Sequence, residues 1–181
     1  MDTALLVIDI QDSFKHSPAR WASRNNPAFE ANVTELLATF REASQPVIFV
    51  LHTDPDPGFR TTDPEFRLMD FLGRGEHEPL LIKNTRNAFT STDLQQRLDT
   101  MGVKKLVICG ISTEQCCETT TRIGADLGYD MTFVTEATAT FPIGRLSAEQ
   151  IVERTEAVLD KRFARIATVA DVKEEMLVSA T

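Results

Sequence analysis

The sequence predicts an α/β protein with a parallel sheet that helices cover on both faces. Short apolar runs alternate along the whole chain with segments in which apolar residues recur at helical spacing. The short runs are continuously apolar instead of alternating with polar residues, which is typical of strands that are buried on both faces. Strands that alternate with helices in this way indicate a parallel sheet.

The strands are predicted from these apolar runs. They cover residues 4–8, 46–51, 80–82, 106–109, 131–135 and 166–169. Between the second and third runs, residues 53–79 are rich in proline and glycine, and we expect a long loop there with a short helix near Phe66–Phe71. A loop of this length in a compact domain often acts as a lid or an interface.

The helices are predicted from apolar spacing and from their end signals. They cover residues 27–43, 92–101, 114–128, a segment that opens at Ser147, and a terminal turn at 171–178. Asn26-Pro27 is a suitable start for the first of them. Ser112-x-x-Gln115 and Ser147-x-x-Gln150 both fit the capping box that opens a helix.

Composition sets limits on the class of protein. With 181 residues, of which 42% are hydrophobic and 25% charged, the chain predicts a single domain, residues 1–181. The net charge of −8 argues against nucleic acid and against an anionic membrane as partners. No run of about 18 apolar residues is present, and the N-terminus resembles a strand more than a signal peptide. The three cysteines fit no disulfide framework, so we expect free thiols and a cytoplasmic protein.

Polar residues follow several of the predicted strands directly. Asp9, His52 and Lys83 each end an apolar run, and the turn 110–116 follows another. Ligands of parallel α/β sheets bind beyond the carboxyl ends of the strands. We therefore expect these groups, which are far apart in the sequence, to meet at one site.

Cys116 is the candidate nucleophile because it falls in the first turn of a predicted helix. The partial positive charge of a helix N-terminus favours a thiolate, and the free N–H groups there can hold an oxyanion. The base that takes the thiol proton could be His52 or Asp9, and Lys83 could supply a stabilising cation.

Each of these residues also has a structural interpretation. Asp9 could cap a turn, Lys83 could be solvated, and Cys116 could be an inert core residue. Cys109 is expected in the core, and Cys117 to point away from the site. A metal site near His52, Asp54 and Asp56 lacks a second histidine, so we predict no metal and no cofactor.

The chain resembles the isochorismatase-like cysteine hydrolases, a superfamily that includes nicotinamidases. The resemblance rests on the blocks LLVIDIQDSF (residues 5–14), KNTRNAF (83–89) and GISTEQCC (110–117), and on GYD…VTEA further along. It implies a three-layer α/β/α sandwich with a six-stranded parallel sheet. It implies that Asp9, Lys83 and Cys116 are the catalytic trio, that the backbone amides of Ser112 and Cys116 form the oxyanion hole, and that the Ile111–Ser112 peptide is cis.

Departures from the family pattern bear on the reaction. Asn87 replaces a serine, Cys117 replaces an aliphatic residue, and the nicotinamidase metal pattern is missing because His52-Thr53-Asp54 runs in the reverse order. The nucleophilic cysteine favours hydrolysis of the C–N bond of a small amide through a thioester. The alternative is an isochorismatase-type vinyl ether hydrolase in which Asp9 is the general acid, and a third hypothesis is a redox sensor that uses Cys116 and Cys117.

The substrate itself is beyond what the sequence predicts, but residues near it are expected. These are Gln11, Phe14, Trp21, His52, Phe59 and Asn87. Substrate specificity would come from residues 53–79 and from a neighbouring subunit. The long loop, the exposed helix faces and the family resemblance predict a homo-oligomer that acts on a small molecule.

Overall fold

The computed structural model describes residues 2–179 and has a six-stranded, fully parallel sheet in the order β3-β2-β1-β4-β5-β6. The strands are β1 (Thr3–Ile8), β2 (Val47–His52), β3 (Leu80–Lys83), β4 (Lys105–Ile111), β5 (Asp130–Ala139) and β6 (Arg165–Ile166). Because β1 and β4 are the central pair, residues that follow them lie in the middle of one edge. The predicted six-stranded parallel sheet is confirmed.

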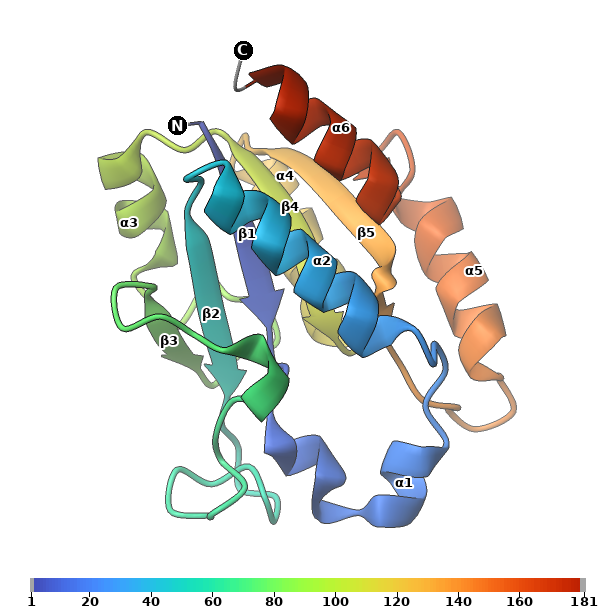
Figure 1. The fold of residues 1–181 in the computed structure, drawn as a ribbon. Helices are drawn as coiled ribbons and strands as arrows, with labels where there is room; N and C mark the ends of the chain where they lie inside the picture. Colours follow the sequence, from blue (N-terminus) through green and yellow to red (C-terminus); the bar gives the residue numbers. More distant parts are fainter. Residues whose placement is uncertain (1, 180–181) are drawn as a thin grey trace.

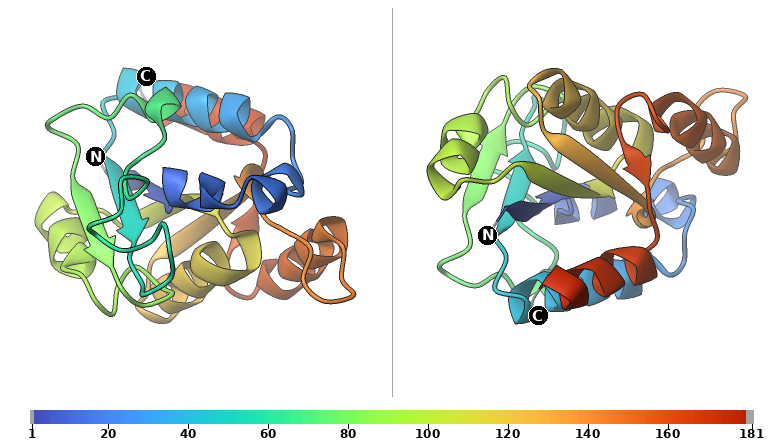
Figure 2. Two further views of the ribbon diagram at one scale, coloured as in Figure 1. Left: turned by 90° about the horizontal axis from the view of Figure 1, so that it is seen from below. Right: turned by 90° about the horizontal axis from the view of Figure 1, so that it is seen from above.

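Helices form a layer on each side of this sheet (Figures 1 and 2). One layer is formed by α2 (Phe29–Glu42) and α6 (Val169–Ser179), and the other by α3 (Leu94–Met101), α4 (Glu118–Asp126) and α5 (Ala148–Leu159). A short helix, α1 (Pro18–Ala22), lies beyond the carboxyl ends of the strands. The three-layer α/β/α arrangement is therefore confirmed.

Each face of the sheet buries its own apolar core. In β1, Leu5 and Val7 pack in the core beneath α2, whereas Leu6 and Ile8 pack in the core on the opposite face. All of β1 and β2 is buried, which is why these strands read as unbroken apolar runs in the sequence. Residues at the carboxyl ends of β1 and β2 are thus anchored on strands that are packed from both sides.

Several boundaries differ from the sequence prediction. Helix α2 begins at Phe29 instead of residue 27, because the Asn26 side chain is bonded to the backbone carbonyls of Glu136 and Thr138 in β5. The predicted last strand is reduced to two residues, and α6 has 11 residues instead of one terminal turn. In the long loop, the short helix is a 3₁₀ turn at Asp70–Leu72.

The two predicted capping boxes have different outcomes. At α5 the box is present, since Ser147 accepts a bond from the Gln150 N–H and Gln150 accepts one from the Ser147 N–H. At Ser112 the prediction is wrong, because the side chain makes no cap and the chain first forms a π-helical turn, Thr113–Cys117, before α4. None of the helices within residues 2–179 is long and apolar enough to span a membrane.

Candidate active site

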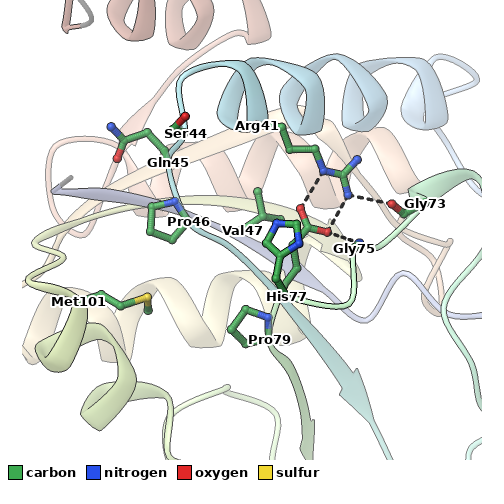
Figure 3. Close-up of a pocket in the computed structure, with 11 residues that line it drawn as sticks. Arg41, Ser44, Gln45, Pro46, Val47, Gly73, Gly75, His77, Pro79 and Met101 are labelled. Carbon is green, nitrogen blue, oxygen red and sulfur yellow. Dashed lines mark hydrogen bonds and ion pairs between the residues drawn. The ribbon is translucent and has the colours of Figure 1, made fainter.

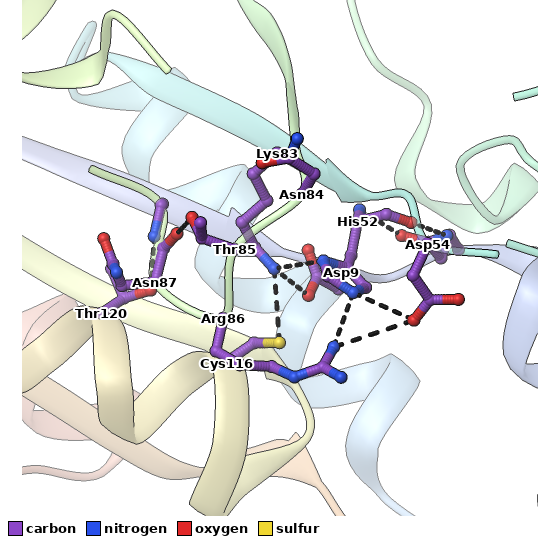
Figure 4. Close-up of polar contacts among 12 residues, drawn as sticks. Asp9, His52, Asp54, Lys83, Asn84, Thr85, Arg86, Asn87, Cys116 and Thr120 are labelled. Carbon is purple, nitrogen blue, oxygen red and sulfur yellow. Dashed lines mark hydrogen bonds and ion pairs between the residues drawn. The ribbon is translucent and has the colours of Figure 1, made fainter. Parts of the chain in front are cut away.

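Asp9, Lys83 and Cys116 meet at the carboxyl edge of the sheet (Figure 4). The Lys83 Nζ atom lies 2.8 Å from Asp9 Oδ2 and 3.3 Å from Cys116 Sγ. Asp9 and Lys83 are 0% exposed and Cys116 is 5% exposed. The structure thus brings together an acid, an amine and a thiol from three separate parts of the chain.

The ends of neighbouring strands position these side chains. Lys83 is the last residue of β3, and it pairs in register with His52, the last residue of β2. Asp9 follows β1 directly and adopts φ 53°, a left-handed conformation that aspartate tolerates better than most residues. This conformation turns the chain at the strand end, where the Asp9 N–H still bonds to the Val50 carbonyl at 2.9 Å.

Lys83 carries a buried ammonium group, which needs three hydrogen-bond acceptors. It finds them in Asp9 Oδ2, Cys116 Sγ and His52 Nδ1, the last at 3.2 Å. Within residues 2–179, the other oxygen of Asp9, Oδ1, is buried and has no hydrogen-bond partner. That oxygen is therefore an acceptor that remains open to a proton.

Burial raises the pKa of the Cys116 thiol, and the negative charge of Asp9 raises it further, against the opposing effect of Lys83. This differs from the expectation that a helix N-terminus would favour the thiolate. Cys116 ends up in the core on the α3/α4 face, and the loss of hydration there outweighs the attraction of one ammonium group. The raised pKa favours the neutral thiol, so a reaction of this sulfur as a nucleophile would need a base.

The turn that carries Cys116 begins with a cis peptide bond between Ile111 and Ser112. The expectation of a cis bond at this position is confirmed. The Ser112 carbonyl accepts bonds from the N–H groups of Gln115 and Cys117, each at 3.2 Å, and so closes the π-helical turn around the thiol. The role of the Ser112 and Cys116 amides as an oxyanion hole stays a prediction.

His52 lies between two cationic side chains. Its Nδ1 atom faces Lys83 at 3.2 Å, and its Nε2 atom lies 3.2 Å from Asp54 Oδ2 and 2.6 Å from the Arg86 guanidinium. Burial lowers the pKa of His52, and the charges of Lys83 and Arg86 lower it further. His52 is therefore neutral at neutral pH. Arg86 was not among the predicted site residues, although its place three residues after a strand end is a signal that could have found it.

The side-chain amides of Gln11 and Asn87 form hydrogen bonds with backbone groups of the protein. Gln11 accepts from the His52 N–H and donates to the His52 carbonyl, so it extends the β2 edge. The Asn87 Oδ1 atom accepts from the N–H groups of Phe89 and Thr90 and thereby caps a turn. Substrate binding by either residue stays a prediction, and these contacts give both of them a structural role.

Aromatic rings approach the site from the loop side. The ring centroid of Phe59 is 6.3 Å from that of His52, and Phe14 packs edge-on against Phe59 at 5.2 Å. Phe141, which the sequence analysis did not name, stacks on Phe14 at 5.8 Å. Trp21 lies on α1 beneath the Arg24 guanidinium, 4.0 Å from its ring centroid. Of the three aromatic residues predicted near the substrate, Phe14, Trp21 and Phe59, it is Phe59 whose ring lies beside His52.

The residues near His52 do not suit a metal ion. In the described part of the chain, no group of three or more His, Cys, Asp or Glu side chains is placed to hold one. The two available donors, His52 Nε2 and Asp54 Oδ2, lie within 2.6 Å and 3.8 Å of the Arg86 guanidinium. A dication at these donors would face a fixed positive charge, so the donor set does not fit a metal.

A separate cleft of about 710 Å³ lies at the opposite end of the sheet (Figure 3). Its lining includes Pro46 and Val47, which are at the amino end of β2, and the ion pair between Arg41 and Glu78. Asp9, Lys83 and Cys116 meet at the carboxyl ends of the strands, so this cleft is separate from them.

Comparison with known proteins agrees with this fold. An isochorismatase domain matches residues 3–174. The chain is 36% identical to nicotinamidase 3 of Arabidopsis thaliana over 155 residues, which cover 76% of this chain and 73% of that protein. It is 30% identical to a streptothricin hydrolase of Streptomyces noursei over 172 residues, 94% of this chain and 60% of that protein.

Among solved structures, a hydrolase of the isochorismatase family from Chromobacterium violaceum superposes with a TM-score of 0.91 at 28% identity. The superposition covers 98% of this chain and 94% of that one. Both the family match and this superposition span nearly the whole length of the chain. The chain therefore belongs to the isochorismatase family and is a hydrolase.

Proposed function

We propose that this hydrolase cleaves the C–N bond of a small amide through a thioester on Cys116. The observation that carries the proposal is the contact of one buried ammonium group, Lys83, with both Asp9 and Cys116. The names of the relatives support the same class of reaction, since nicotinamidase 3 is an amidase by name.

In the proposed reaction, Asp9 Oδ1 takes the proton from the Cys116 thiol while the sulfur attacks the amide carbon. The carbonyl oxygen becomes an oxyanion, which the backbone N–H groups of Ser112 and Cys116 would hold. The C–N bond then breaks, and the leaving amine takes the proton from Asp9. Water attacks the thioester in the second half, with Asp9 as the base again, and releases the acid and the free thiol.

Lys83 would stabilise the charges that change during these steps. Its ammonium group bonds to the carboxylate that moves the proton and lies beside the sulfur that becomes negative. Because burial raises the pKa of Cys116 in the resting site, the thiol proton has to pass to a base, which is the role of Asp9 in this proposal.

The test is an ammonia-release assay on a panel of small amides, carbamates and ureas, followed by acid quenching and mass spectrometry. We expect a mass increase on the peptide that contains Cys116, and a loss of at least about 10³-fold in turnover for Cys116→Ala. Cys109→Ala is the matched control, because Cys109 is buried in the core beneath α2 and is not part of the trio.

The vinyl ether alternative predicts a different result for the same variants. In that reaction Asp9 acts as a general acid on the substrate, and the sulfur is not needed. Turnover of a vinyl ether substrate by Cys116→Ala at the wild-type rate, with no acyl adduct in the wild type, would contradict the thioester route.

A further inference from the structure

Arg86 places a second positive charge at the mouth of the site. Its side chain is 55% exposed, whereas that of Lys83 is 0% exposed. The Arg86 guanidinium is connected to the nucleophile through two side chains, since it touches His52, His52 touches Lys83, and Lys83 touches Cys116 (Figure 4). Arg86 is thus the exposed end of a series of contacts that leads to the buried Cys116 thiol.

The His52 ring can accept only one of the two bonds that its cationic neighbours offer. Lys83 and Arg86 are both donors without acceptor atoms, and a neutral imidazole has a single acceptor nitrogen. The closer contact is that of Arg86, whose Nη1 atom lies 2.6 Å from Nε2, whereas the Lys83 Nζ atom lies 3.2 Å from Nδ1. In either tautomer of the neutral ring, one of the two cations faces an N–H group of His52 in place of an acceptor. His52 therefore does not satisfy both cations.

Asp54 satisfies Arg86 only partly. The distance from Arg86 Nη1 to Asp54 Oδ2 is 3.8 Å, longer than the roughly 2.7–2.9 Å of a charge-assisted hydrogen bond. The Asp54 Oδ1 atom accepts from the Asp56 N–H at 2.8 Å, and Oδ2 lies 3.2 Å from His52 Nε2. Among the described residues, Arg86 makes its polar contacts through Nη1 alone, to His52 and at a longer distance to Asp54. The other N–H groups of this exposed guanidinium fork therefore have no acceptor in the described part of the chain.

We propose that Arg86 binds a carboxylate of the substrate, so that the substrates are small amides that also carry an acid group. This proposal rests on the proposed amide hydrolysis and narrows its substrate class to amidic acids and carbamoyl amino acids. The guanidinium fork matches the two oxygens of a carboxylate in a bidentate pair. On this assignment Arg86 determines specificity and takes no part in bond breaking.

The first test uses two alkylating agents of similar size, iodoacetate and iodoacetamide, which differ in the negative charge. The rate of modification at Cys116 is measured for each by peptide mass mapping at a fixed pH, and the ratio of the two rates cancels the thiolate fraction. We expect Arg86→Gln to lower the iodoacetate/iodoacetamide ratio about tenfold, because a bond to a charged group is lost.

Two further variants separate recognition from general charge effects. Arg97→Gln removes the same charge from α3, where Arg97 is exposed and pairs only with Asp93 among the described residues, so it should keep the wild-type ratio. Arg86→Lys keeps the charge but loses the fork, and it should give an intermediate ratio. An unchanged ratio in Arg86→Gln, or an equal fall in Arg97→Gln, would overturn the proposal.

The second test uses turnover of matched amides, succinamate against butyramide. We expect the wild type to favour succinamate in kcat/KM by about tenfold or more, mainly through KM, and Arg86→Gln to lose this preference. Turnover of both amides with equal kcat/KM would contradict the carboxylate-binding role of Arg86 and would leave the proposed amide hydrolysis intact. Absence of any amide turnover and of any adduct on Cys116 would instead contradict the proposed function, while the alkylation ratio would still decide the role of Arg86.

Discussion

At the scale of single residues, the protonation of Cys116 is set by two neighbours with opposite effects. Asp9 raises the pKa of the thiol and Lys83 lowers it, while burial raises it most. Below its pKa, a thiol gains tenfold in thiolate for each pH unit, and it gains the same for each unit by which the pKa falls. The reactivity of Cys116 toward a neutral reagent therefore reports on both neighbours.

We predict that Asp9→Asn speeds the alkylation of Cys116 by iodoacetamide while it abolishes turnover. Removing the carboxylate lowers the pKa of the thiol, so more thiolate is present at a given pH, but the base is lost. An increase of about tenfold near pH 8 is expected. Lys83→Met should slow the same alkylation. In the wild type the rate should still rise with pH above pH 9, because the pKa of the buried thiol is raised.

The control for these variants is the far-ultraviolet circular dichroism spectrum and the thermal midpoint, because breaking a buried ion pair costs about 3–5 kcal/mol. Variants that stay folded at the assay temperature give an interpretable rate. Slower alkylation in folded Asp9→Asn than in the wild type would contradict the opposing roles assigned to Asp9 and Lys83.

Single residues also show how far sequence alone predicts this site. Asp9, Lys83 and Cys116 could be found because they lie at the end of an apolar run or in the turn after one, and parallel strands bring their ends to one edge. The role of Gln11 could not be predicted, because its amide bonds to the His52 backbone, which only the folded chain brings near. The role of Asn87 is local, since its amide caps the turn at Phe89 and Thr90, and asparagine is typical of such turns. The place of Arg86 three residues after β3 was a usable signal, but its contact with His52 at the end of β2 could not be predicted, because only the folded sheet brings the two together.

At the scale of the secondary-structure elements, the end of β4 holds the nucleophile turn against β1. Gly110 there has φ +142°, and a Cβ atom added to it would lie 2.0 Å from the Ile8 carbonyl oxygen. That oxygen belongs to the backbone of the neighbouring strand, so it cannot move without shifting the β1–β4 pairing. The close approach of these two strands thus depends on the missing side chain.

We predict that Gly110→Ala destabilises the protein by more than about 3 kcal/mol, a fall of roughly 10 °C in thermal midpoint. Gly102→Ala is the matched control, because Gly102 also has a positive φ, +71°, but a Cβ atom there would meet nothing within 4 Å. It should cost only about 1–2 kcal/mol of backbone strain. Equal falls for the two variants, measured by calorimetry, would show that strain alone and not the approach to Ile8 sets the cost.

The elements were predicted best where apolar patterning alone defines them. The buried strands β1 and β2 and the capped helix α5 follow directly from their residues. The turn 113–117 was predicted as a capped helix start, but the chain forms a π-helical turn there, and the Ser112 side chain makes no cap. The length of α6 was missed because its stability comes from packing against α2 and β5, which the sequence pattern of 171–178 does not reveal.

At the scale of the whole molecule, one sheet separates two apolar cores, and each core contains a buried cysteine. Cys109 lies in the core shared with α2 and α6, and Cys117 lies in the core shared with α3 and α4. Both are 0% exposed, so a thiol reagent reaches either one only when its layer opens. These two thiols therefore report separately on the two sides of the sheet.

We predict that Cys109 and Cys117 become accessible at the same urea concentration, because both helical layers pack on the same buried strands and lose their support together. The experiment uses Cys116→Ala, which removes the accessible thiol, and measures modification at each cysteine by peptide mapping along a urea series. The midpoint of circular dichroism on the same samples gives global unfolding. If one layer could leave the sheet while the other stayed, its cysteine would react well below that midpoint. A protected Cys109 beside a reactive Cys117 would then show that the α3/α4/α5 layer, which carries the nucleophile turn, opens independently, and the prediction of a single cooperative domain would be wrong.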